Sequence, residues 1–176
     1  TEAVSIGKGT NAGNYAVAIG NNAGNTTQDQ GAVAIGSEAG ETNQGPRAIA
    51  IGNYAGETDQ DYSAIAIGYE AGETTQGGKA IAIGQFAGQT NQAQGNVAIG
   101  SGAGNTDQGS VAVAIGEAAG GINQSASAVA IGQNAGSTGQ GEWAVAIGRS
   151  AGKVNQADNS IVINASGGDL NNTTAN

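Results

Sequence analysis

Three glutamates recur at a constant spacing, and carboxylates in such a row could bind a cation. Glu41, Glu57 and Glu73 are evenly spaced along the chain, and Asp59 and Asp61 follow Glu57 closely. If successive units stack, neighbouring carboxylates lie about 5 Å apart and repel by about 1 kcal/mol per pair in water. In other units the same position holds unrelated residues: Asn25, Gln89, Gly121, Ser137 and Lys153. A solvated edge and a cation site both fit this column, and the alternative stays open.

The segment GETTQGGK, residues 72–79, is close to a phosphate-binding loop. Such a loop needs a lysine directly after its second glycine and then a serine or threonine. Gly72 and Gly77 have the required spacing, but Gly78 displaces Lys79, and Ala80 takes the hydroxyl position. We therefore expect no nucleotide site here.

Composition excludes several classes of function. The chain has no histidine and no cysteine, so it lacks the commonest general base, thiol nucleophiles and the usual zinc ligands. We predict no enzyme and no cofactor. A net charge of -9 with only five basic residues argues against nucleic-acid binding. No stretch approaches the roughly 18 apolar residues of a membrane span, so we expect no membrane insertion of this segment.

One phrase repeats along nearly the whole chain. An isoleucine precedes a glycine or its replacement at every sixteenth position from Ile19 to Ile163. The interval from Ile6 to Ile19 is smaller, so the first unit is short. Alanine–glycine and glutamine positions keep the same period. The phrase is A-[VI]-A-I-G-x-x-A-G-x-T-x-Q-x-x-x.

A repeat of this length predicts an all-β fold, a parallel β-solenoid with 16-residue coils. AVAIG is typical of a strand, T-x-Q is a shorter second strand, and the triplets between them form corners. We expect about ten repeats over residues 1–164, and a C-terminal tail over residues 165–176 that leads to a further domain.

Side chains alternate between the two faces of a strand, so the isoleucines and alanines of AVAIG must face opposite ways. We expect the branched side chains inside, because they carry most of the apolar bulk. The predicted core ladder comprises Ile35, Ile51, Ile67, Ile83, Ile99, Ile115, Ile131 and Ile147. The alanines would then form an outer face and a subunit interface, comprising Ala48, Ala50, Ala64, Ala66, Ala80, Ala82, Ala112 and Ala114.

The second strand and the aromatic residues give further expectations. The threonine column becomes Ile122 and Val154 in two coils, which predicts an inward or half-buried position. The glutamines should stack their amides along the axis. Four aromatic residues in variable positions are candidate ligand contacts: Tyr54, Tyr69, Phe86 and Trp143.

The phrases NYAVAIG, GAVAIG, RAIAIG and SAIAIG resemble the head repeat of the YadA-like trimeric autotransporter adhesins. The likeness covers about residues 3–164. It implies a left-handed β-roll and a homotrimer. The segment NSIVINASGGDLNNTTAN resembles the part that closes such repeats in tail-fibre-like proteins of phages and large algal viruses.

These observations predict a structural segment of a trimeric surface or virion fibre that displays or spaces an attachment function. Its location would be extracellular, and its partners would be two further copies and a cell-surface receptor or glycan. The alternative is an ice-binding solenoid that exposes an array of threonine and glutamine.

Overall fold

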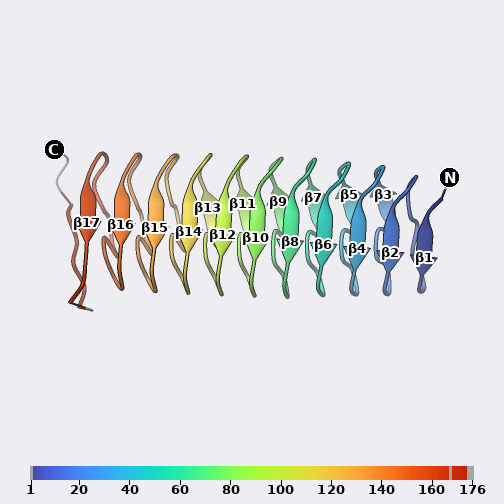
Figure 1. Cartoon of the computed structure of the whole chain (residues 1–176), viewed down its shortest axis with the longest axis horizontal. Helices are drawn as coiled ribbons and strands as arrows, with labels where there is room; N and C mark the ends of the chain where they lie inside the picture. Colours follow the sequence, from blue (N-terminus) through green and yellow to red (C-terminus); the bar gives the residue numbers. More distant parts are fainter. Residues whose placement is uncertain (1, 167, 174–176) are drawn as a thin grey trace.

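The computed structural model describes residues 2–166 and 168–173 and shows an elongated rod of β-strands (Figure 1). Within this part of the chain the backbone winds into a parallel β-solenoid of about ten turns with 16-residue coils. The predicted all-β solenoid is therefore confirmed. The first turn is shorter than the others, since Val4 pairs with Val17, whereas Val17 pairs with Val33.

The larger of two sheets takes one strand from each coil. Within the described residues it contains 11 parallel strands in register, so that Ile67, Ile83 and Ile99 lie side by side. Its strands are β1 Val4–Ile6, β2 Val17–Ile19, β4 Val33–Ile35, β6 Ile49–Ile51, β8 Ile65–Ile67, β10 Ile81–Ile83, β12 Val97–Ile99, β14 Val113–Ile115, β15 Val129–Ile131, β16 Val145–Ile147 and β17 Ile161–Ile163. At a strand spacing of about 4.8 Å the sheet is about 48 Å long.

The smaller sheet is built from the T-x-Q segments. Its six parallel strands are β3 Thr26–Gln28, β5 Thr42–Gln44, β7 Thr58–Gln60, β9 Thr74–Gln76, β11 Thr90–Gln92 and β13 Thr106–Gln108. Beyond β13 the pairing continues as single bridges through Ile122, Thr138 and Val154. The segment GETTQGGK thus forms β9 and the corner that follows it.

Alanine side chains fill the interior, and the predicted core ladder is wrong. Ala80, Ala82 and Ala87 are fully buried, as are the alanines at equivalent positions in the regular coils, while Ile83 is 36% exposed. The isoleucines expected in the core all lie on the outer surface, half-buried or exposed: Ile35, Ile51, Ile67, Ile83, Ile99, Ile115, Ile131 and Ile147.

The predicted alanine interface is wrong for the same reason. The alanines assigned to it are sealed inside the single chain and cannot touch another subunit: Ala48, Ala50, Ala64, Ala66, Ala80, Ala82, Ala112 and Ala114. Two adjacent strand residues face opposite ways, so a buried Ala82 places its neighbours Ile81 and Ile83 outside.

A buried glutamine explains why alanine is inside. The Gln76 side chain is fully buried and crosses the interior, where its Nε2 donates to the Ile65 carbonyl of the opposite sheet at 2.8 Å. This bridge holds the sheets at the reach of one glutamine, and methyl groups fill most of the remaining space. The larger side chains buried in the same columns are those of Asn96 and, in the last coil, Ser160 and Val162. In a regular coil, where alanine already fills the space, a branched side chain would overpack the core.

The glutamines also bond to one another along the rod axis, which confirms the predicted amide stacking. Each Nε2 donates to the Oε1 of the next coil, as from Gln76 to Gln92 at 3.0 Å. The ladder runs from Gln28 to Gln156. Its first acceptor, the Oε1 of Gln28, is the one buried side-chain polar atom in the described part of the chain that has no partner.

Left-handed backbone conformations also occur inside the strands of the smaller sheet. Asp59, in the middle of β7, has φ 55°, and Asn and Asp tolerate this region better than most residues. It breaks the strand alternation, so that Gln60 is buried while Thr58 lies partly exposed on the outer side. The threonines thus face outward, and the expectation of an inward or half-buried position holds in part, since Thr42 and Thr58 are half-buried whereas Thr74 is exposed.

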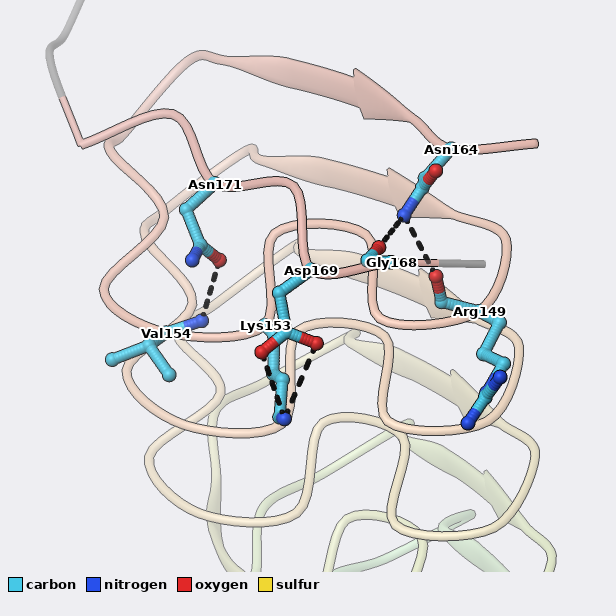
Figure 2. Close-up of polar contacts among 7 residues, drawn as sticks. All are labelled: Arg149, Lys153, Val154, Asn164, Gly168, Asp169 and Asn171. Carbon is cyan, nitrogen blue, oxygen red and sulfur yellow. Dashed lines mark hydrogen bonds and ion pairs between the residues drawn. The ribbon is translucent and has the colours of Figure 1, made fainter. Parts of the chain in front are cut away.

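The glycine after each AVAI segment is required by close backbone approach. Gly52 has φ 135°, and a Cβ there would lie 2.3 Å from the carbonyl oxygen of Gly68 in the next coil. Neither the conformation nor the space admits a side chain. Asn164 replaces this glycine in the last coil, where its side chain donates to the carbonyls of Arg149 and Gly168 (Figure 2).

The described part of the C-terminal tail lies against the last coil. Lys153 and Asp169 form an ion pair at 3.0 Å, and the Asn171 Oδ1 accepts from the Val154 amide at 2.9 Å (Figure 2). Residues 168–172 thereby cover the end of the smaller sheet and bond amides that a further coil would otherwise take.

Candidate functional site

The outer side of the larger sheet is a continuous surface of branched aliphatic side chains. In the regular coils it consists of the first and last residue of each strand, Val or Ile followed by Ile, and we call it the aliphatic face. The exposed fraction is 38% at Ile147 and reaches 67% at Ile163. Its members are Val4, Ile6, Val17, Ile19, Val33, Ile35, Ile49, Ile51, Ile65, Ile67, Ile81, Ile83, Val97, Ile99, Val113, Ile115, Val129, Ile131, Val145, Ile147, Ile161 and Ile163.

The aliphatic face is large enough to be an interface. Summed over these residues the exposed apolar area is on the order of 1,000 Å², whereas the largest patch on a typical monomer is about 300–600 Å². A specific protein–protein interface takes about 800 Å² from each partner. The sequence argument expected the apolar surface on the alanine side of this strand, and the structure has it on the isoleucine side.

Glutamates gather at the corner that follows the larger sheet. Carboxylate oxygens of Glu38, Glu41 and Glu57 lie within 4.8 Å of one another. The Gln89 Nε2 donates to Glu70 at 2.7 Å and to Glu73 at 2.6 Å. We call Glu38, Glu41, Glu57, Glu70 and Glu73 the acidic corner.

Crowding at the acidic corner changes the acidity of its central residue. Partial burial raises the pKa of the Glu57 carboxyl above its ordinary value, and the negative charges of Glu73, Glu38, Glu41 and Glu70 add to the increase in that order. A cation could be held here by carboxylate oxygens, the ligands that hard cations prefer. The column of Glu41, Glu57 and Glu73 was visible in the sequence. Glu38 and Glu70 were missed, although they share a repeat position with Tyr54.

Three of the four candidate aromatic residues meet at this corner. The ring of Tyr69 packs edge-on against Tyr54 at 6.3 Å and Phe86 at 5.6 Å between centroids. A hydrogen bond to Glu70, with smaller contributions from desolvation and neighbouring charges, raises the pKa of Tyr69. Trp143 does not join them. It is 57% exposed at the other corner, ahead of β16.

The other corner carries shallow hollows. One, of about 280 Å³, is lined by Asp29, Asn43, Gly45, Pro46, Asp59, Gln60 and Asp61. Asn43 donates to Asp59 at 2.8 Å, and the Tyr62 amide donates to Asp61 at 2.6 Å. In the neighbouring coil the Lys79 ammonium lies 5.7 Å from the centre of the Tyr62 ring. The lysine of the apparent phosphate loop is thus a corner residue in contact with an aromatic ring.

Comparison with known proteins found no matching family model, curated protein or solved structure. The residues described by the structure include no helix long and apolar enough to cross a membrane.

Proposed function

We propose that this chain is a rigid segment of a homotrimeric surface or virion fibre, in which it spaces or displays an attachment function. The solenoid would be left-handed, as the resemblance to YadA-like head repeats implies, and the fibre extracellular. The observation that carries the proposal is the aliphatic face. It runs along every coil of the rod and has no counterpart on the smaller sheet, whose outer side carries threonines.

Burial of this face by identical copies fits its chemistry. Its side chains make no hydrogen bonds, so only the removal of apolar surface from water stabilises a contact with them. The gain in free energy is about 25 cal/mol for each Å² buried. Identical rods with one apolar face each form a closed assembly when these faces meet around a common axis. Three copies then bury the aliphatic faces and leave the acidic corner, Tyr54 and Phe86 on the outside, with Tyr69 at the edge of the contact.

The outer corners are where an attachment function would be displayed. Tyr54, Tyr69 and Phe86 form one ordered cluster beside carboxylates, and we propose them as contacts for a receptor or glycan. Trp143 lies too far along the rod, on the other corner, to belong to the same contact.

The mass of the protein in solution tests the fibre proposal. Light scattering should give three times the chain mass of 16.9 kDa. The double variant Ile83→Asp/Ile99→Asp places charges on the aliphatic face and should give monomers with unchanged β-structure by circular dichroism. Thr74→Asp/Thr90→Asp, on the outer side of the smaller sheet in neighbouring coils, is the matched control and should remain trimeric. A wild-type protein that stays monomeric at tens of micromolar contradicts the proposal.

An ice-binding solenoid remains the second candidate function, because the threonines lie on the outer side of the smaller sheet. They form a single column, which Ile122 and Val154 interrupt. The residue between each threonine and glutamine adopts a left-handed conformation, and its identity varies among Asn, Asp, Thr and Gly. This surface is less regular than the aliphatic face, so the fibre is the better supported function.

A further inference from the structure

Each strand of the larger sheet is flanked by two residues that border the aliphatic face. One stands two positions before the strand and the other two positions after it. For β16 these are Trp143 and Arg149. They do not touch within one chain, because they lie at opposite ends of the extended strand Val145–Ile147.

A three-fold assembly brings opposite borders together. The inference rests on the proposed homotrimer. Rotation about an axis parallel to the rods keeps every residue at its height, so the border before a strand in one subunit lies against the border after the same strand in the next. Residues of one coil that are far apart within a chain thereby become neighbours between chains.

The border residues are compatible with this pairing along the whole rod. None of the same-coil pairs in the described chain joins two charges of like sign, and Glu2 with Lys8 joins opposite charges. The pairs are Glu2 with Lys8, Tyr15 with Asn21, Gly31 with Ser37, Arg47 with Asn53, Ser63 with Tyr69, Lys79 with Gln85, Gly95 with Ser101, Val111 with Glu117, Ser127 with Gln133, Trp143 with Arg149, and Asn159 with Ala165.

We propose that Trp143 of each subunit stacks against the guanidinium of Arg149 of the partner subunit, and that this contact fixes the three rods in register. Indole is the ring that binds cations best, and arginine is its commonest partner. Trp143 is the only tryptophan of the chain and is 57% exposed.

Arg149 has its side chain available for this contact. Its exposed guanidinium makes none of the contacts drawn in Figure 2, where only its backbone carbonyl accepts a hydrogen bond, from Asn164. The nearby carboxylate of Asp169 is already paired with Lys153 at 3.0 Å. At the opposite end of the rod Glu2 and Lys8 pair by charge in the same way.

A disulfide trap tests the contact directly, because the natural chain has no cysteine. A disulfide requires Cα atoms about 4.4–6.8 Å apart, so the variant Trp143→Cys/Arg149→Cys cannot close a bridge within one chain. Oxidation should link the protein into covalent trimers, with nothing larger on a non-reducing gel. Trp143→Cys/Ser101→Cys is the matched control. Position 101 lies on the same border as position 149 but three coils earlier, about 14 Å along the axis. Its cysteine should therefore stay unlinked.

The outcomes separate this inference from the proposed function. Light scattering that shows a trimer while the paired cysteines remain free overturns the Trp143–Arg149 contact and leaves the fibre proposal standing. Covalent dimers as the end product overturn three-fold pairing, since two parallel rods related by a two-fold axis along their length would give them. Unlinked monomers in light scattering overturn both proposals.

A double-mutant cycle gives an independent measurement. Trp143→Ala and Arg149→Gln should each raise the trimer dissociation constant, and the coupling between them should be about two- to thirtyfold for each contact. Arg47→Gln is the matched single control, because Arg47 faces Asn53 and should show no coupling with Trp143→Ala. Strictly additive effects of Trp143→Ala and Arg149→Gln would overturn the stacking contact.

Discussion

Gln60 and Gln76 join their side-chain amides inside the rod, where the Nε2 of Gln60 donates to the Oε1 of Gln76 at 3.0 Å. Both side chains are fully buried. Each amide also bonds the opposite sheet, so a single residue ties together two coils and two sheets. The polar ladder, and not apolar bulk, determines how far apart the sheets stand.

Removal of one rung should be costly. In Gln76→Ala the Nε2 of Gln60 loses an acceptor, the Oε1 of Gln92 loses its donor, and a cavity remains. We expect the free energy of unfolding to fall by about 3–5 kcal/mol. Thermal unfolding followed by circular dichroism measures it. The exposed Gln30→Ala should be nearly neutral, and an equal effect of both substitutions would show that the ladder contributes nothing.

The reversed orientation of the larger sheet can be tested with two small substitutions. Ala82→Val adds two methyl groups to a filled interior and should cost about 1–3 kcal/mol. Ile81→Val acts on the outer side, at a position where Val17, Val33 and Val97 occur in other coils. It should change the melting temperature little. The opposite ranking would mean that branched side chains line the interior.

The glycine column should not accept even a methyl group. Gly52→Ala places a Cβ 2.3 Å from the Gly68 carbonyl oxygen at φ 135° and should destabilise the rod by about 3 kcal/mol or more. Gly102→Ala is the control. A Cβ there meets nothing within 4 Å, and Ala118 already occupies the same position in the next coil. Its cost should stay at about 1 kcal/mol. Equal melting temperatures for the two variants would refute close coil contact.

The acidic corner should make stability fall as pH rises through its titration. Because the pKa of Glu57 is raised in the folded state, the folded protein binds more protons than the unfolded chain between the ordinary value of 4.5 and the raised value. The charged form is therefore the destabilising one. Glu57→Gln should increase stability at pH 7, by less than about 1 kcal/mol at this largely solvated position, and lose the advantage below pH 4. Thermal unfolding across this pH range tests the sign, and a Glu57→Gln protein less stable at pH 7 would show a bound cation or another favourable partner.

An ice-binding protein would show thermal hysteresis, and the outer side of the smaller sheet is not suited to produce it. Single-file threonines interrupted by Ile122 and Val154 do not form an extended regular face. We expect no thermal hysteresis and no faceted ice crystals at 100 micromolar protein, measured by nanolitre osmometry. Crystal shaping abolished by Thr74→Asp would instead assign the smaller sheet to ice.

The sequence predicts the coil, its period and its strands because these depend on repeat spacing and alternation alone. Alternation says that Ala82 and Ile83 face opposite ways but not which is inside, and hydrophobic bulk favours the wrong answer. One signal could have decided it. The column of Ala82 holds small residues throughout the regular coils, whereas the column of Ile81 exchanges Ile and Val. A position limited to the smallest side chain is a position without space.

The corners were less predictable, because they depend on side chains that meet only after the coils stack. Tyr69 and Phe86 belong to successive coils and occupy different repeat positions, so no column connects them, yet their rings touch. Residue type alone groups Trp143 with them, and residue type carries no information about which corner a residue occupies.

The bonds between coils run along the rod, and this has a mechanical consequence. The amide of Gly84 donates to the Ile67 carbonyl at 2.8 Å, and the same connection recurs from coil to coil. A force that pulls along the axis therefore breaks the hydrogen bonds of the end coil first and then those of the next coil. It does not load the bonds of all coils at the same time, as a shearing force would. Each 16-residue coil that detaches would release about 50 Å of extended chain. A fibre built from such rods would be stiff under small loads and would lengthen in equal steps beyond a threshold force.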